Sequence, residues 1–176
     1  MKRDKIIDTA ISELGNHDLD VSVYPSRYYS GGYNWCAEFV CYCYKEAGYP
    51  LTGGQFSSQV ETDEDGDWMH RTTGRLIDYF TVKHEFIDRN HKKWFDYIPR
   101  PGDFVWIGRH NYEDGSNDRL HAGLVEYSHP DGTLHTIEGN NSKRPVMRFC
   151  YPRYKTNLRN NGSANGIVMG FGVLSE

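Results

Sequence analysis

Residues 35–47 read WCAEFVCYCYKEA and carry the clearest structural signal in the chain. Their apolar positions recur at the spacing of one face of an α-helix, which the following residues share: Cys36, Phe39, Val40, Cys43, Tyr44 and Ala47. Gly48 and Pro50 follow and end the run. The pattern predicts an amphipathic helix that begins near Cys36.

The segments around this helix predict that helices come first in the chain and that strands follow. We expect further amphipathic helices at residues 4–14 and 73–80, and loops at 16–34 and 51–71. Five later stretches have the composition of strands separated by turn residues: 103–107, 121–127, 133–138, 146–151 and 167–173. This order predicts an α+β fold in a single domain, 1–176, with N-terminal helices packed on a C-terminal antiparallel sheet of about five or six strands.

The composition argues against several classes of protein. The chain has 176 residues and a net charge of -4, and its Lys and Arg residues are not clustered, so we expect no nucleic-acid partner. No stretch approaches the ~18 apolar residues of a spanning helix, and no apolar signal-peptide region follows the start. We therefore expect no membrane insertion, and we expect a monomer that is made in the cytoplasm.

The four cysteines are interpreted as thiols without disulfides, and one of them is a candidate nucleophile. Cys36 lies at the N-terminus of its helix, where unpaired N–H groups and the helix dipole favour the reactive thiolate. A buried, unreactive side chain would explain the same position. Cys41 and Cys43 lie deeper in the helix and are interpreted as small apolar residues. A metal site built on these two is a weaker alternative, because they point about 200° apart around the helix.

A nucleophilic cysteine needs a general base, and the chain offers eight histidines. His121 opens an apolar strand, AGLV at residues 122–125, directly after a polar loop. A side chain in that position can reach a cleft while the strand fixes its backbone. The other histidines lie in expected loops or polar segments or, like His135, in the middle of a strand. Position therefore favours His121 as the base.

The next strand offers an acidic partner for His121. If Tyr127 pairs with Gly132 across a four-residue loop, His121 lies opposite Glu138, close enough for the carboxylate to orient the imidazole. Asn140 would point the same way, because side chains alternate along a strand. A solvated acid at the end of a strand is the alternative interpretation of Glu138. The predicted site therefore depends on this register.

Four short segments of the chain occur in a familiar order: NWCAEFV at 34–40, RPGDFV at 100–105, HAGLV at 121–125 and IEGN at 137–140. In this order they resemble the CHAP family of cysteine, histidine-dependent amidohydrolases and peptidases, which are relatives of the NlpC/P60 enzymes with a papain-like core. The resemblance spans most of the chain, from about residue 30 to residue 173. It implies that the α+β fold has a papain-like, NlpC/P60-like core.

The resemblance also implies a role for each matched residue. Cys36 would be the nucleophile, His121 the base, Glu138 the group that orients the base, and Asn140 a further polar member of the site. The implied substrate and partner is peptidoglycan, which would be cut through a thioester intermediate. Either an N-acetylmuramoyl-L-alanine amidase or an endopeptidase of the stem or cross-bridge fits the resemblance.

The segment before the cysteine supplies candidates for substrate binding and for the oxyanion hole. The oxyanion would be held by the Cys36 backbone N–H and by an upstream side chain, for which Tyr33 and Asn34 are the nearest candidates. Several aromatic residues could line the substrate groove, although core packing would also explain each of them: Tyr28, Tyr29, Tyr33, Trp35 and Trp106.

No metal or other cofactor is expected. Some members of the family carry an Asp-rich calcium loop shortly before the cysteine, and residues 20–35 lack one. The acidic run DEDGD at 63–67 lacks a glutamate at position twelve of a calcium loop, and it is interpreted as an exposed turn.

Two other functions stay open. The chain could be a wall-binding or interaction module that keeps the fold without chemistry. Loss of the cysteine or the histidine would favour this alternative, and both Cys36 and His121 are present. It could also be a papain-like hydrolase that acts on an amide outside the wall. A wall hydrolase without a signal peptide would reach its substrate after lysis, through a holin or through a secretion system, as an endolysin or a delivered effector does.

Overall fold

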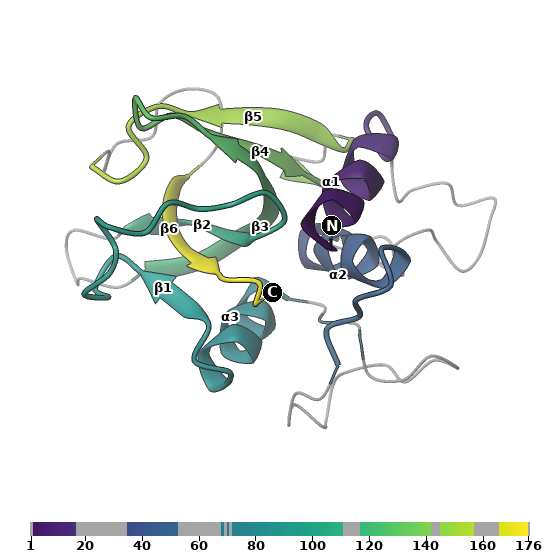
Figure 1. Cartoon of the computed structure of the whole chain (residues 1–176), viewed down its shortest axis with the longest axis horizontal. Coiled ribbons are helices and arrows are strands. Elements are labelled where there is room, and N and C mark those ends of the chain that lie inside the picture. The colour runs from purple at the N-terminus through teal and green to yellow at the C-terminus, as the bar shows by residue number, and fades with distance from the viewer. Residues whose placement is uncertain are drawn as a thin grey trace.

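The computed structural model describes residues 2–16, 35–52, 68, 70, 72–110, 117–141, 145–156 and 166–175. The helices in these segments are α1 (Lys2–Ser12), α2 (Cys36–Glu46) and α3 (Thr73–Val82). The strands are β1 (Phe86–Asp88), β2 (Phe104–His110), β3 (Asn117–Ser128), β4 (Leu134–Glu138), β5 (Met147–Tyr151) and β6 (Ile167–Gly172). Helices precede strands, as predicted (Figure 1).

The described strands form one antiparallel sheet in the order β1-β6-β2-β3-β4-β5, which confirms the predicted α+β class. Several boundaries differ from the prediction, and two of the differences follow from strand pairing. β1 was not predicted, because a strand of three residues that pairs only with β6 is too short to show alternation. β3 begins at Asn117 rather than at His121, because pairing with the end of β2 extends the strand through polar residues.

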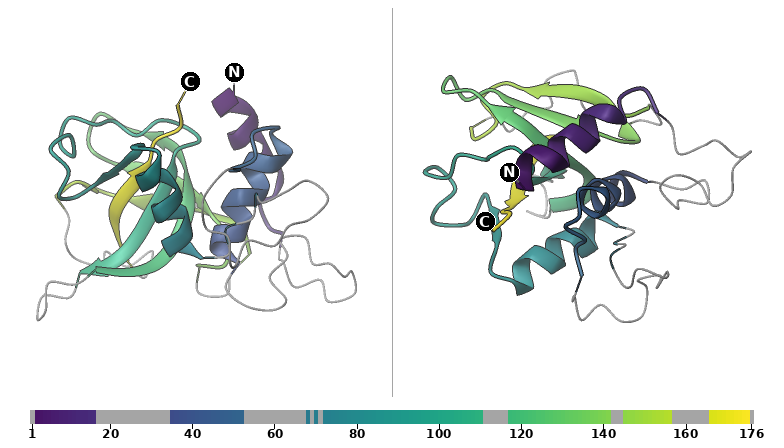
Figure 2. Two further views of the ribbon diagram at one scale, coloured as in Figure 1. Left: turned by 90° about the horizontal axis from the view of Figure 1, so that it is seen from below. Right: turned by 45° about the vertical axis from the view of Figure 1, so that its right-hand side comes forward.

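The sheet separates two hydrophobic cores. The helices cover one face of the sheet, and residues from α1, α2 and α3 pack there with Phe104, Leu124 and other strand residues (Figure 2). The sheet curves around the second core, which contains Val105, Val125 and Phe171. Consecutive residues of β2 and of β3 thus face different cores, as strand alternation requires.

α2 is the helix that positions the candidate nucleophile, and it packs against both β3 and α1. Its buried side chains extend around most of its circumference, because the sheet lies on one side of it and α1 on another (Figure 2). The predicted apolar stripe is confirmed, since Phe39, Val40, Cys43 and Tyr44 are fully buried. Burial on several sides fixes the helix relative to the sheet, and with it the position of Cys36.

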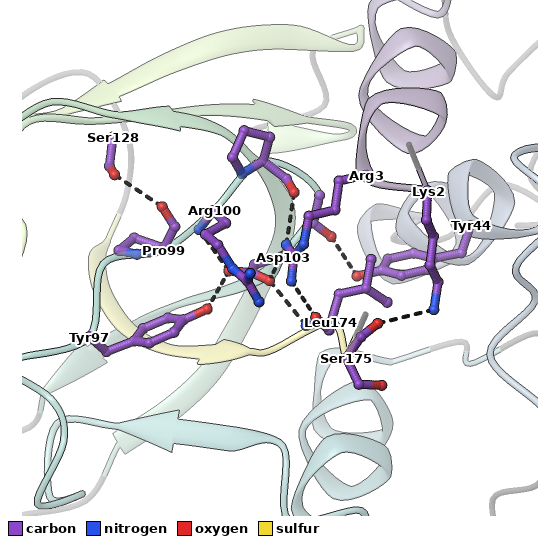
Figure 3. A network of polar contacts seen from close by, with 12 residues as sticks. Lys2, Arg3, Tyr44, Tyr97, Pro99, Arg100, Asp103, Ser128, Leu174 and Ser175 are labelled. Carbon is purple, nitrogen blue, oxygen red and sulfur yellow. Dashed lines mark hydrogen bonds and ion pairs between the residues drawn. The ribbon is translucent and has the colours of Figure 1, made fainter.

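The buried carboxylate of Asp103, directly before β2, joins the two ends of the described chain (Figure 3). Oδ1 of Asp103 accepts hydrogen bonds from Arg3 Nη1 at 2.7 Å and from the backbone N–H of Leu174 at 3.0 Å. Oδ2 accepts from the hydroxyl of Tyr97 and from the backbone N–H of Arg100 at 2.8 Å. The RPGD part of the second motif therefore holds α1 and the segment after β6 against the start of β2.

No helix in the described parts of the chain combines the length and the apolar character that crossing a bilayer requires. All four cysteines lie in described segments, and none of them forms a disulfide. This agrees with the interpretation of the cysteines as thiols. The stability of the fold rests on the two cores and on buried polar contacts such as those of Asp103.

Candidate active site

Cys36 is the first residue of α2, as the apolar spacing predicted, and only 6% of its surface is exposed. Trp35, the residue before it, makes no side-chain cap to the helix, and the dipole of the helix favours a negative charge at this end. The Cys36 Sγ also lies 3.8 Å from the Oγ1 of Thr73, which is the first residue of α3. Two helix N-termini therefore meet at the sulfur.

His121 lies on β3, where it pairs with Ile107 of β2. Its Nε2 lies 2.9 Å from Oε2 of Glu138, and its side chain is 13% exposed. The ring also lies beside the Cys36 side chain, close enough for each group to shift the pKa of the other. Because Glu138 engages Nε2, the nitrogen that serves Cys36 is Nδ1. The imidazole thus lies between the sulfur and a carboxylate, in the arrangement that a nucleophile and its general base require.

The surroundings of Cys36 and His121 favour a negative charge on the sulfur and a positive charge on the ring. Burial alone would raise the pKa of the Cys36 thiol, but the charge and hydrogen bond of His121, with smaller contributions from the Ala122 backbone and Thr73, lower it. Burial alone would lower the pKa of His121, but the charge of Cys36 and hydrogen bonds to Cys36 and Glu138 raise it from 6.5 to about 10. Both shifts therefore favour the thiolate and the imidazolium over the neutral thiol and the neutral ring.

Glu138 is fully buried and accepts four hydrogen bonds. Oε2 accepts from His121 Nε2 and from Asn141 Nδ2 at 2.7 Å. Oε1 accepts from the hydroxyl of Thr136 at 2.6 Å and from that of Tyr151 at 2.8 Å. Burial raises the pKa of Glu138, but the bonds to His121, Thr136 and Asn141 and the charge of His121 outweigh burial and lower it. The carboxylate stays ionised and fixes the imidazole ring.

The contact between His121 and Glu138 forms through a register that differs from the predicted one. Ser128 pairs with Leu134 and a β-bulge lies at Glu126, so the predicted pairing of Tyr127 with Gly132 is wrong. Beyond the bulge Leu124 pairs with Ile137, and one further step in this register places Glu138 opposite Gly123, two residues from the predicted position. A shift of two residues keeps the same face of the sheet, so the long side chain of Glu138 reaches His121 diagonally.

Gly123 leaves the space through which this diagonal contact passes. A Cβ atom at Gly123 would lie 2.7 Å from Cγ of Glu138, a distance at which one of the two must shift. A larger residue at Gly123 would therefore displace the carboxylate from His121. The glycine in the HAGLV motif is explained by this close approach rather than by a turn.

Asn140 was expected to point toward the site because side chains alternate along a strand. β4 ends at Glu138, and Asn140 has a φ of 59°, in the left-handed region, so that argument does not apply to it. The amide that donates to Glu138 belongs to the next residue, Asn141. The role of Asn140 therefore stays a prediction.

Trp35 lies in the hydrophobic core with 2% of its surface exposed, a position that does not favour the predicted contact with substrate. A Cβ atom at Gly139 would lie 2.3 Å from Cζ3 of Trp35 and 3.1 Å from Cβ of Phe39. The absence of a side chain at Gly139 thus lets the start of α2 approach the end of β4. The other two candidates for substrate or oxyanion binding, Tyr33 and Asn34, lie outside the described residues, as do Tyr28 and Tyr29.

The other cysteines of α2 differ from Cys36 in their electrostatics. Burial raises the pKa of Cys41 to about 12, and burial together with nearby carboxylates raises that of Cys43. Both are fully buried, as expected for small apolar residues, and Cys41 Sγ accepts a hydrogen bond from the His70 backbone. Within one helix, therefore, only the cysteine at the N-terminus has a lowered pKa.

Sequence reasoning missed four side chains that surround the predicted residues: Thr73, Thr136, Asn141 and Tyr151. Thr136 had a local signal, because it lies two residues before Glu138 and so shares its face of β4. Tyr151 lies on β5, and its contact depends on a pairing that no local pattern indicates. The same holds for Thr73, since it approaches Cys36 from a helix that is separate in sequence.

A family model described as the CHAP domain matches residues 28–140, a range that contains Cys36, His121, Glu138 and Asn140. A search of curated proteins found no match. A search of solved structures also found none. The matched range covers more than half of the 176 residues and includes α2, α3 and the first four strands.

Proposed function

The chain belongs to the CHAP family, and from that premise we propose that it hydrolyses amide bonds of bacterial peptidoglycan with Cys36 as nucleophile and His121 as general base. Members of this family are cysteine, histidine-dependent amidohydrolases and peptidases. The observation that carries the proposal is the continuous contact from the Cys36 thiol through the His121 ring to the buried Glu138 carboxylate.

The proposed reaction begins with the thiolate–imidazolium pair. The Cys36 sulfur attacks the carbonyl carbon of the amide, and the carbonyl oxygen becomes an oxyanion. His121 then gives its proton from Nδ1 to the amide nitrogen, the carbon–nitrogen bond breaks, and an amine leaves. The acyl group stays on Cys36 as a thioester.

Water completes the proposed cycle. His121, now neutral, takes a proton from water as the oxygen attacks the thioester carbon. The carbon–sulfur bond breaks, which releases the carboxylic acid and restores the thiolate beside a protonated ring. Glu138 keeps Nε2 protonated throughout and stabilises the positive charge on the ring. Thr73 supports the sulfur position from α3.

The oxyanion is proposed to lie at the N-terminus of α2. The backbone N–H of Cys36 is the first donor of that helix, and the field of the helix favours a negative charge there. A side-chain donor from Tyr33 or Asn34 stays a prediction, because both residues lie outside the described segments.

The proposal is tested by the release of new amino groups from purified peptidoglycan. Cys36→Ala and His121→Ala, assayed separately, should each reduce the rate by at least ~10³-fold. Cys150→Ser on β5 is the matched control, because it removes a thiol outside the site and should leave the rate unchanged. Unchanged release in either site variant, or binding of wall by the wild type without any release, would contradict the proposal.

Mass spectrometry of the released fragments then identifies the bond. Cleavage between muramic acid and L-alanine exposes the amino group of L-alanine, whereas cleavage within the stem or cross-bridge exposes a different amine. We propose the first of these, an amidase, and digestion of several wall types would test it. A new amine on any residue other than that L-alanine would assign an endopeptidase instead.

A further inference from the structure

A pocket of about 460 Å³ lies beside the candidate active site, between the second half of α3, β1 and β2. Two pairs of neighbouring residues connect the pocket with the site. Thr73 contacts the Cys36 sulfur, and Ile77, which lines the pocket, follows one turn later, ~6 Å along the helix. Trp106, which also lines the pocket, pairs with Ala122, the neighbour of His121. The pocket therefore lies next to the candidate active site, on the face of the sheet that the helices cover.

Two polar side chains that line this pocket, those of Trp106 and His91, can each present an N–H donor. The indole Nε1 of Trp106 is buried and has no hydrogen-bond partner among the residues that the structure describes. Nδ1 of His91 accepts the backbone N–H of Lys93 at 3.1 Å, so the proton of a neutral ring is on Nε2, which can donate to a ligand. A ligand acceptor that reaches the indole would relieve this cost, because a buried N–H without a partner is unfavourable.

The remaining lining groups restrict the kind of acceptor. Asp88 is half-buried and one of its oxygens accepts the Asn90 backbone N–H, so the carboxylate disfavours a phosphate or carboxylate ligand. The second oxygen of Asp88 is suited to an N–H on the ligand. Phe86 adds an apolar ring whose centroid lies 6.2 Å from that of Trp106. A planar, uncharged group with one acceptor and one N–H fits this combination, and a secondary amide is such a group.

We propose that this pocket is a substrate subsite that binds a secondary amide next to the scissile bond, with Trp106 donating to the amide oxygen and Asp88 accepting from its N–H. The inference rests on the proposed function for the identity of the substrate. Peptidoglycan offers secondary amides from two sources, the acetamido groups of its amino sugars and the peptide bonds of its stems. Both present the same hydrogen-bonding pattern to the pocket.

The first test observes the indole directly. Full-length ¹⁵N-labelled Cys36→Ala protein is titrated with the β-1,4-linked tetramer of N-acetylglucosamine in one arm and with a stem tetrapeptide in the other. The Trp106 indole N–H cross-peak, assigned with Trp106→Phe, should shift in one of the two arms. A shift with the sugar tetramer would identify an acetamido group as the ligand, and a shift with the tetrapeptide would identify a peptide bond. The Trp94 cross-peak is the internal control, because that indole already donates to the Lys155 carbonyl at 3.3 Å. No shift of Trp106 in either arm would overturn the subsite.

The second test uses the active chain and separates binding from chemistry. Trp106→Phe and Asp88→Asn should raise KM about tenfold with a smaller change in kcat, since each removes one hydrogen bond to the substrate. Asp96→Asn, an exposed carboxylate outside the pocket, should leave both parameters unchanged. A fall in kcat at constant KM would overturn the inference. A wild-type chain that releases no amino groups would refute the proposed function instead, and the titration would still decide whether the pocket binds an amide.

Discussion

Glu138 and Asp103 are both fully buried carboxylates that accept four hydrogen bonds, yet their cationic partners differ in kind. Asp103 faces the guanidinium of Arg3, with 2.7 Å between Nη1 and Oδ1. Glu138 faces His121, which titrates and also contacts Cys36. A buried carboxylate beside a permanent cation holds segments together, whereas one beside a weak base can control where a proton resides.

The hydrogen-bond donors of the two carboxylates differ as well. Two donors to Glu138 are hydroxyl groups, those of Thr136 and Tyr151, which can rotate and accept as well as donate. Three donors to Asp103 are N–H groups, which can only donate, and they come from Arg3, Arg100 and Leu174. A neutral amide is therefore compatible with the site of Glu138 and incompatible with that of Asp103. Substituting each acid by its amide separates the two roles.

The largest effect is expected for Asp103→Asn, and it is an effect on stability. The amide NH₂ must face at least one N–H donor, and Arg3 is left without its counter-charge, so unfolding should become easier by about 3–5 kcal/mol. Urea denaturation measures this change. In the fraction of the variant that stays folded, iodoacetamide should alkylate Cys36 at the wild-type rate. A slower reaction of the folded fraction would show that Asp103 also acts on the site.

Glu138→Gln should have the opposite profile, with a large effect on rate and a smaller one on stability. The Gln carbonyl can accept from His121 and Asn141 while its NH₂ donates to the two hydroxyls, so the hydrogen bonds are kept and only the charge is lost. We expect kcat to fall about 10- to 100-fold, the loss of one charge-assisted interaction. Urea denaturation of the same variant is the control. A stability loss as large as that of Asp103→Asn would remove the distinction between the two carboxylates.

The pH dependence should distinguish the two carboxylates next. The activity of the wild type should fall as pH rises through about 10, where His121 loses its proton. Because the folded pKa of His121 is raised above 6.5, the stability that it contributes is fully present below pH 6.5 and is lost as pH rises through about 10. Glu138→Gln should move this basic limb to lower pH, whereas Asp103→Asn should leave it in place. A limb that does not move in Glu138→Gln would contradict the assignment.

The smallest effects are expected when one donor is removed from each carboxylate. Asn141→Ala should reduce kcat severalfold, and Tyr97→Phe should reduce the free energy of unfolding by about 1 kcal/mol without affecting kcat. Parallel measurement of kcat and of urea denaturation on both variants checks this. Equal effects of the two substitutions on kcat would mean that the two hydrogen-bond networks are not independent.

Local patterns predicted the features that depend on a single element. The apolar spacing of α2 predicted both the helix and the N-terminal position of Cys36. His121 was selected because an apolar run follows it, although β3 begins four residues earlier. β1 escaped prediction because it has only three residues and is stabilised by pairing with β6. The fold class was accessible because the order of helices and strands is itself a property of the sequence.

Contacts between elements were predicted less reliably. The contact of Glu138 with His121 was predicted from an incorrect register, and it holds because a shift of two residues preserves the face of the strand. Strand alternation did not place Asn140, because β4 had already ended at Glu138. Tyr151 had no local signal, since its approach to Glu138 depends on the pairing of β4 with β5.

The β-bulge at Glu126 has a consequence for how this hairpin tolerates insertions and deletions. Two residues of β3, Val125 and Glu126, lie opposite one residue of β4, so deletion of Glu126 would shorten the strand and leave every pair toward His121 as it is. Deletion of Ala122 would instead turn His121 to the opposite face and away from Glu138. Lineages of this fold can therefore gain or lose a residue at the bulge and keep the ring and the carboxylate in contact.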